Sequence, residues 1–452
     1  MVRLKRQLSD FRVSEVLNES GDLLGPGPWS LYRVTKRGLT TPEAVGLLAE
    51  AAGVPASAVE YAGLKDKDAV TSQFMTVLGG RRVKLREDAL SVEWQGTATR
   101  ALQSGDNLRN SFELVLRDLS GDDMRRVRVN LLQVRNGGLP AYFDDQRFGS
   151  LRHGQGFIVR KLLRGDVEGA LRDLFTAPSP YGDAGVERYK AEVARRWGNW
   201  DALVRYARGG RGASLFEYLH EHPDDFIGAF RRGISTSERT IHLFAYQSHL
   251  WNHAAALWIR GVTPPEQLGW LPSDDGALPV HRVLDAGVTA ALRSVHLPLF
   301  GRGMQLSDDA RRYYESVFRA EGVDPERFLA LDVPGFRPQG EDRPLLCFPE
   351  HARAAPAERD DIYKERHKMR LRFHLPRGQY ATLVAKRLLL PTERAARPPK
   401  LWISRHCQTY PDAEGQTPWQ AVLPAPRDAG SPRPPAPRPK SRGGPQDTRP
   451  HD

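Results

Sequence analysis

The chain has 452 residues, of which 40% are hydrophobic, and it carries a formal net charge of +11 at neutral pH. This length is enough for about two or three domains, and the positive charge predicts a polyanionic partner. Its apolar runs are too short for a transmembrane helix, and its two cysteines, Cys347 and Cys407, exclude a disulfide scaffold and a cysteine-rich zinc site and fit a reducing cytoplasm.

The first predicted elements are two strands and a helix. Residues 10–17 and 29–35 alternate apolar with polar side chains, as half-buried strands do. Thr40 and Glu43 have the spacing of a capping box, and Gly53 follows the last apolar residue of the same segment. These residues therefore bound a helix.

The next segments again mix strands with a helix. Residues 74–78 and 112–116 have the apolar patterns of strands. Ser120 is placed to cap a helix that ends near Gly137. Such a mixture indicates the α+β class rather than a regular repeat of strand, helix and strand.

The character of the chain changes in its middle and again near its end. Strand-like character returns at 368–389, and a Pro/Arg-rich tail follows from about 424 that cannot bury a core and is expected to be disordered. This order predicts one domain with a largely helical domain inserted in it. The expected helices of the middle cover residues 186–207, 236–260, 307–321 and 324–331.

The most informative stretch reads Tyr-Ala-Gly-Leu-Lys-Asp-Lys-Asp-Ala-Val-Thr-Ser-Gln at residues 61–73, where Asp66 and Asp68 alternate with two lysines. Neighbouring ammonium groups keep a carboxylate ionised, and an ionised carboxylate can act as a nucleophile or a base. Taken alone, the spacing also fits a solvated charged turn, because structural ion pairs gather carboxylates in the same way.

Several segments together resemble the TruD family of tRNA pseudouridine synthases. They follow one another in the order of the family and cover roughly residues 4–390. The strongest are YAGLKDKDAVTSQ (61–73), RNSFELVLR (109–117), LPAYFDDQRFG (139–149) and RFHLPRGQYAT (372–382), and the weaker ones are DFRVSEVL (10–17) and YQSHLWN (246–252).

The resemblance implies an α+β fold: a pseudouridine-synthase catalytic domain with a mixed, mainly antiparallel sheet, interrupted by a largely helical insertion (TRUD) domain. The expected limits are 1–160 plus 361–395 for the catalytic domain, 161–360 for the insertion, 396–423 for a C-terminal extension and 424–452 for the tail.

The resemblance also implies an activity, the isomerisation of a uridine of tRNA, at position 13 of the D arm, to pseudouridine. Asp66 matches the catalytic carboxylate, and its attack on the sugar, its attack on the base and its removal of the C2′ proton all remain open. The family implies no cofactor, no metal and no membrane, and we expect a monomer. The rival hypotheses are a catalytically impaired RNA-binding protein with the same fold and a nucleic-acid remodelling factor that acts through charge.

Two further residues match family positions in the catalytic cleft. Phe143 matches the aromatic residue that stacks on the target base, although an ordinary core aromatic fits its sequence context as well. Lys5 matches a basic residue that would face the carboxylate or a phosphate, although it could also be a terminal lysine without such a role.

Three more residues are expected to contact substrate. They are Lys65, next to the catalytic carboxylate, and Gln146 and Arg147, which would shape the pocket or contact the RNA backbone. Arg147 could equally pair with Asp144 or Asp145 at the surface.

The chain departs from the family pattern at a few positions. Ala141 stands where the family has asparagine, and Asp68 stands where it has histidine or arginine. We expect another polar group, Asp144 or Asp68, to compensate for the missing asparagine side chain. His249 and His253 have the helical spacing of a metal-binding pair, but no third ligand is near them in the sequence, so we predict a packed helix face.

Overall fold

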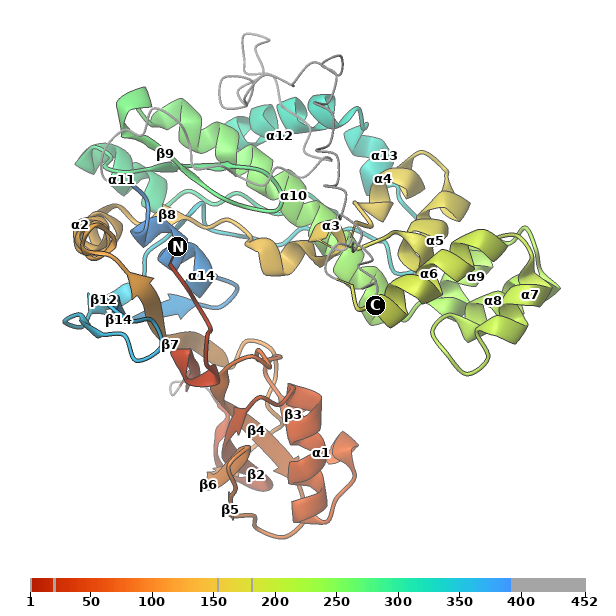
Figure 1. The fold of residues 1–452 in the computed structure, drawn as a ribbon, viewed down its shortest axis with the longest axis horizontal. Helices are drawn as coiled ribbons and strands as arrows, with labels where there is room; N and C mark the ends of the chain where they lie inside the picture. Colours follow the sequence, from red (N-terminus) through yellow and green to blue (C-terminus); the bar gives the residue numbers. More distant parts are fainter. Residues whose placement is uncertain (1, 19–21, 153, 180–181, 392–452) are drawn as a thin grey trace, which may run out of the picture.

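The computed structural model describes residues 2–391 except 19–21, 153 and 180–181 (Figure 1). The predicted extension at 396–423 and the predicted tail at 424–452 lie outside these residues. Within the described part of the chain, no helix combines the length and the apolar character needed to cross a membrane.

A ten-stranded mixed sheet forms the centre of the fold. One pair of neighbouring strands, the first and fourth in the chain, is parallel, and the other pairs are antiparallel. The predicted sheet type and the α+β class are therefore confirmed. The strand order is β12 (Glu350–Ala354), β14 (His367–Pro376), β7 (Asn107–Leu119), β1 (Phe11–Leu17), β4 (Val70–Leu78), β2 (Leu24–Arg37), β6 (Leu90–Ala98) and β5 (Leu85–Arg86), with β13 (Glu358–Arg359) beside β14 and β3 (Val59–Tyr61) beside β4.

Four short strands form two separate antiparallel pairs. One pair joins the region after β7 to the segment before β12, so two segments that are far apart in the sequence lie side by side. The strands are β8 (Leu139–Pro140) with β11 (Leu346–Cys347), and β9 (Leu268–Leu271) with β10 (Leu278–His281).

Helices surround the sheet unevenly. Figure 1 shows the first helix beside strands β2–β6 in the lower part, a long helix crossing the upper part, and a group of helices to the right. The helices are α1 (Thr41–Ala52), α2 (Gly121–Gly137), α3 (Gly149–Arg152), α4 (Ile158–Leu163), α5 (Val167–Thr176), α6 (Ala184–Arg196), α7 (Trp200–Tyr206), α8 (Ala213–Glu221), α9 (Phe226–Gly233), α10 (Thr236–Val262), α11 (Ala286–Arg293), α12 (Asp308–Glu321), α13 (Pro325–Leu329) and α14 (Ala381–Leu388).

Local chemistry sets the limits of α1 and α2 as predicted. Thr40 accepts a hydrogen bond from the backbone of Glu43 at the start of α1, and Gly53 ends this helix with a positive φ of 73°. Ser120 caps α2 in the same way. The second helix runs through Gly137, one residue further than expected, because the neighbouring glycine takes the turn.

The single helix predicted at 186–207 is wrong. The chain forms α6 and α7 with a break between them, because Gly198 adopts a left-handed φ of 89°. The side chain of Asn199 then accepts a hydrogen bond from the backbone of Ala202 and begins a new helix. A glycine followed by a capping residue outweighs the continuous apolar period here.

The strand expected at 368–389 is confirmed only as far as Pro376, and the rest of the prediction is wrong. Strand β14 ends at Pro376, which has no N–H for a ladder, and Gly378 turns the chain with a φ of 76°. Helix α14 follows. Tyr380 and Thr382, expected in the sheet, therefore lie at the start of this helix.

Three aromatic rings from neighbouring strands form a row on the helix-covered face of the sheet. The Phe11 and Phe112 ring centroids are 6.2 Å apart, and those of Phe112 and Phe373 are 5.7 Å apart. All three side chains are buried in the core that continues into α2, α10 and α14. Because core side chains are closely packed, this row forms a rigid apolar surface.

Candidate active site

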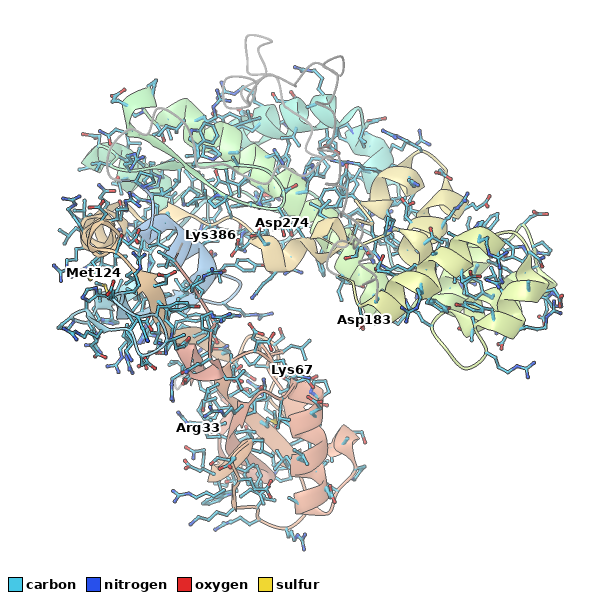
Figure 2. All side chains as sticks on the ribbon, in the orientation of Figure 1. Arg33, Lys67, Met124, Asp183, Asp274 and Lys386 are labelled. Carbon is cyan, nitrogen blue, oxygen red and sulfur yellow. The ribbon has the colours of Figure 1, made fainter. Side chains whose placement is uncertain are left out.

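The Asp66 loop joins β3 to β4, and a buried lysine holds its backbone by hydrogen bonds. The ammonium of Lys36 donates to the carbonyls of Leu39, Lys65 and Asp66 at 2.7, 3.2 and 2.8 Å. Burial lowers the pKa of Lys36. Figure 2 shows Lys67, from the same loop, on the side of the lower part that faces the elements above it.

A second tie fixes both ends of this loop. The hydroxyl of Thr41, the first residue of α1, accepts from the backbone N–H of Lys65 at 3.0 Å and donates to Gln73 at 3.1 Å. The amide of Gln73 in turn donates to the Gly63 carbonyl at 3.3 Å. The start of α1 and strand β4 therefore hold the backbone that presents Asp66.

The carboxylate of Asp66 keeps a path to solvent while it is oriented on both sides. Its side chain is 29% exposed and forms an ion pair with Lys5. The backbone N–H of Asp68 donates to its other oxygen at 3.1 Å. The Lys5 ammonium also lies 4.1 Å from the centroid of the Phe11 ring, which is within the range of a cation–π contact.

Lys65 has a partner of its own on the sheet. Its ammonium forms an ion pair with Glu15, whose side chain is fully buried. The same carboxylate accepts from the backbone N–H of Phe74 at 2.8 Å. In this conformation Lys65 therefore links the Asp66 loop to β1 and β4, and its predicted contact with substrate stays a prediction.

A cavity of about 240 Å³ opens beside the Asp66 carboxylate. This volume is slightly below the range of drug-sized pockets, so it suits a single base better than a larger ligand. Phe11 and Phe112 of the aromatic row form its floor, and the turn before α14 forms its wall. The lining residues are Phe11, Val13, Leu64, Lys65, Asp66, Asn110, Phe112, Gln146, Gly378, Gln379, Tyr380, Ala381 and Thr382.

Phe143 lies one layer behind this wall. Its backbone is held by the side chain of Asn252 of α10, which accepts at 2.8 Å and donates at 2.9 Å. Its ring is 6% exposed and meets Trp251 and Tyr380 edge to face. In this conformation Tyr380 lines the cavity and Phe143 supports it.

Of the other two residues predicted to contact substrate here, one lines the cavity and one does not. Gln146 lines the cavity, whereas the guanidinium carbon of Arg147 lies 5.6 Å from the centroid of the Phe143 ring. The carboxylates of Asp144 and Asp145 bind Lys386 at 2.6 and 2.7 Å, so they serve α14 rather than Arg147. Burial opposes their effect, but these carboxylates raise the pKa of Lys386.

Arg343 is a residue of the site that was not predicted from the sequence. This buried side chain donates to the carbonyl of Ala141 at 2.9 and 2.5 Å and to that of Gly378 at 3.2 Å. Burial lowers its pKa to about 10. The sequence signal for Arg343 is its position directly before the apolar run Pro344-Leu345-Leu346-Cys347. A charge buried at such a position is costly unless it is paired or hydrogen-bonded.

The alanine that replaces the family asparagine is enclosed. The Ala141 side chain is buried, and its backbone N–H donates to Leu345 at 2.9 Å. Asp144, one of the two residues expected to compensate, uses its carboxylate on Thr382 and Lys386. The other, Asp68, contacts Asp66 through its backbone.

The expectation that no third ligand approaches His249 and His253 is wrong. Asp275, from the loop after β9, lies 2.6 Å from Nδ1 of His249 and 3.5 Å from Nε2 of His253. Glu321 of α12 lies 3.1 Å from the other nitrogen of His249. Burial opposes the effect of these two carboxylates, but they raise the pKa of His249, and burial lowers that of His253.

Comparisons with known proteins identify the family of the chain. The sequence model of the family "tRNA pseudouridine synthase D (TruD)" matches residues 1–388. The probable tRNA pseudouridine synthase D 1 of Methanococcus maripaludis is 26% identical over 392 residues, which cover 86% of this chain and 99% of that protein. The probable tRNA pseudouridine synthase D of Methanopyrus kandleri is 33% identical, with 81% of this chain and 86% of that protein covered.

A solved structure shows the same fold. The crystal structure of a TruD protein from Methanosarcina mazei superimposes with a TM-score of 0.64 at 21% sequence identity, covering 85% of this chain and 93% of that one. The fold and the family match over most of the chain agree with each other. The chain therefore belongs to the TruD family of tRNA pseudouridine synthases, which are isomerases.

Proposed function

We propose that this chain converts a uridine of tRNA to pseudouridine, with Asp66 as the catalytic carboxylate. The observation that carries the proposal is the position of this side chain. It is partly exposed, it is paired with Lys5, and it borders a cavity that suits a single base. A carboxylate fixed in this way can serve as a nucleophile or a base.

The chemistry requires one bond to break and another to form. The bond between N1 of uracil and C1′ of the ribose breaks, the base turns, and C5 bonds to C1′. C5 loses its proton to solvent and N1 gains one. Asp66 acts by attack on the sugar, by attack on the base or by removal of the C2′ proton, and all three routes place its carboxylate next to the flipped-out nucleotide.

The cavity would receive the base after it leaves the stack. Phe11 and Phe112 form the apolar floor, and Gln146 offers a polar group to the edge of the base. Tyr380 offers an aromatic ring in the wall of the cavity. Phe143 takes the stacking role if Tyr380 moves aside on binding. Stacking of this kind offsets part of the cost of unstacking the base, at about 1–3 kcal/mol per base.

The substrate is proposed to be the D arm of tRNA, at uridine 13, by likeness to the family. Unmodified tRNA transcripts labelled with tritium at C5 of uridine test this directly, because isomerisation releases the label to water. Mapping of pseudouridine in the product should place it at position 13. Tight binding of tRNA without tritium release would support the impaired RNA-binding protein instead.

A further inference from the structure

Lys5 reaches Asp66 from a segment with little regular structure. We call residues 2–10 the strap, which ends in a single turn of 3-10 helix at Leu8–Asp10. Lys5 lies in its middle with a φ of 54°, a left-handed conformation that is uncommon for a residue with a side chain. A conformation of this kind persists where the surroundings impose it.

One residue of β7, Arg117, holds both sides of Lys5. The backbones of Arg3 and Arg117 exchange two hydrogen bonds of 3.0 Å each. The Arg117 side chain then donates to Gln7 at 3.4 Å and to both oxygens of Asp10 at 3.0 and 2.9 Å. The five residues from Arg3 to Gln7 are therefore fixed at each end by Arg117.

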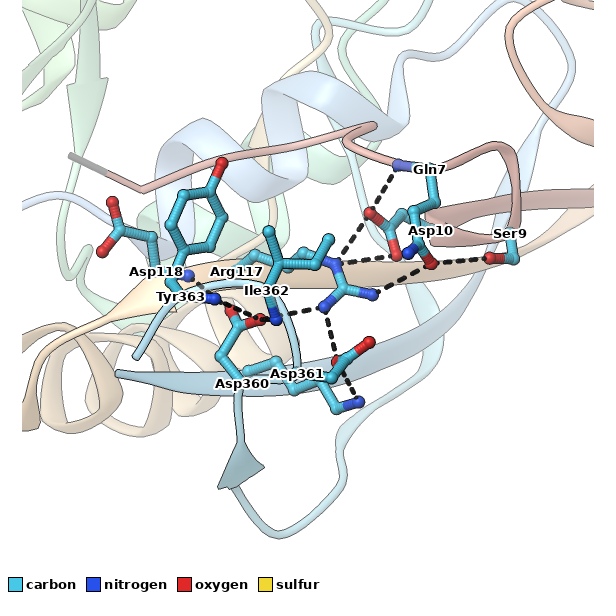
Figure 3. A network of polar contacts seen from close by, with 10 residues as sticks. Gln7, Ser9, Asp10, Arg117, Asp118, Asp360, Asp361, Ile362 and Tyr363 are labelled. Atoms are coloured by element: carbon cyan, nitrogen blue, oxygen red, sulfur yellow. Dashed lines mark hydrogen bonds and ion pairs between the residues drawn. The ribbon is translucent and has the colours of Figure 1, made fainter. Parts of the chain in front are cut away.

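Arg117 is itself fixed from the opposite side (Figure 3). Its guanidinium donates to Asp360 at 3.0 Å and to Asp361 at 2.8 Å, in the loop between β13 and β14. Asp360 also accepts from the backbone N–H of Asp118 at 2.9 Å. A planar guanidinium suits several carboxylates at once, and a lysine in its place would offer a single point charge.

The burial of the Arg117 guanidinium and its partner Asp10 indicates a role beyond stability. Arg117 is 4% exposed, and the Asp10 side chain is almost fully enclosed. Buried ion pairs contribute little net stability compared with apolar residues of the same volume, and a role in fixing one geometry is the better-attested reason to keep them. The geometry fixed here is the path of the strap that carries Lys5.

We propose that Arg117 is a positioning residue for the reaction: it holds the strap so that the Lys5 ammonium lies on the Asp66 carboxylate. The inference rests on the proposed function of Asp66. It assigns no contact between Arg117 and the substrate, so Arg117 acts through Lys5 alone.

A double-mutant cycle tests this dependence on full-length protein. Asp10→Asn loosens the strap while Arg117 keeps Asp360 and Asp361, and Lys5→Met removes the ammonium but keeps the length of the side chain. We expect Asp10→Asn to lower kcat about tenfold with little change in KM, and to have no further effect in the Lys5→Met background, because residues that act through one contact are not additive.

Asp361→Asn is the matched control, because Asp361 binds the same guanidinium from the loop side. It should not couple to Lys5→Met. Thermal melting checks that each variant folds. If Asp10→Asn does not fold, Arg3→Pro replaces it, since proline removes the backbone N–H of residue 3 that donates to the Arg117 carbonyl.

The possible outcomes separate this inference from the proposed function. An inert wild type on every tRNA would overturn the proposed function. An active wild type would overturn the role of Arg117 if the strap variant turned over at the wild-type rate. The same conclusion would follow if the strap variant and Lys5→Met lowered kcat independently of each other.

Discussion

The guanidinium carbon of Arg343 lies 4.0 Å from the centroid of the Phe143 ring. The same side chain joins the carbonyl of Ala141, two residues before this ring, to the carbonyl of Gly378, in the wall of the cavity. A buried guanidinium thus holds together the two segments that carry Phe143 and Tyr380.

Arg343→Lys should slow pseudouridine formation by roughly tenfold or more, because an ammonium cannot bridge the two carbonyls as a planar fork does. Arg387→Lys is the control. Arg387 is also buried, but it donates to Asn130 and Gln133, away from the cavity. Each variant should lose stability, by about 1–3 kcal/mol for a hydrogen bond left unmade. Equal loss of turnover in both would show that Arg343 has no special place in the site.

Phe143→Leu should reduce turnover about tenfold if the Phe143 ring stacks on the base, from the loss of about 1–3 kcal/mol of stacking. Leucine fills most of the volume and avoids the large cavity that alanine would leave in this buried position. Tyr380→Leu measured beside it identifies the ring that meets the base. Turnover of Phe143→Leu at the wild-type rate would limit Phe143 to packing behind Tyr380.

Ala141→Asn restores the family residue in an enclosed position. Because the Ala141 side chain is buried, the larger side chain should lower the free energy of unfolding by about 1–3 kcal/mol, as extra volume in a packed site does. If another polar group compensates in the native chain, turnover should change by less than about tenfold. If the wild type has no activity and this substitution makes it active, the hypothesis of a compensating polar group is contradicted. The result would favour the catalytically impaired RNA-binding protein.

The free energy of unfolding should fall as the pH is lowered from about 6.5 to 4. Burial lowers the pKa of His281 to about 4, so the unfolded state binds a proton in this range that the folded state does not. The stability that this neutral side chain contributes is therefore fully present above about pH 6.5, and it is lost as the pH falls to about 4. It amounts to at most about 3 kcal/mol.

His281→Gln should flatten this dependence while glutamine keeps a donor for the Gly137 carbonyl, which His281 meets at 3.0 Å. Denaturant titrations at several pH values measure it. His220→Gln, at an exposed position, is the control and should leave the slope unchanged. An unchanged slope in His281→Gln would show that His281 does not cause the pH dependence. The remaining candidate would be His242, because burial also lowers the pKa of His242 to about 4.

Local signals in the sequence predicted the elements that depend on local chemistry. The capping residues of α1 and α2 act through backbone groups three residues away, so their positions could be read directly. The Asp66 loop was predicted for a similar reason. Its charges are close together in the chain, and the segment resembles one family motif.

The parts that were missed depend on distant contacts. Arg343 meets Ala141 only through the pairing of β8 with β11, about two hundred residues apart, and Asp275 reaches His249 from a loop that no local pattern identifies. The apolar run after Gly378 fits a strand or a helix, and packing against α2 and β9 decides for the helix. Sequence periods cannot report such packing.

The most direct test of Asp66 as the catalytic carboxylate compares Asp66→Asn with Asp68→Asn. Both substitutions remove one negative charge from the same loop, and Asp68 contributes a backbone N–H that asparagine retains. Asp66→Asn should abolish tritium release from labelled tRNA while the Kd for tRNA changes by less than about twofold, since phosphate contacts supply most affinity. Asp68→Asn should keep most of the turnover. Measurable turnover by Asp66→Asn would contradict its assignment as the catalytic carboxylate.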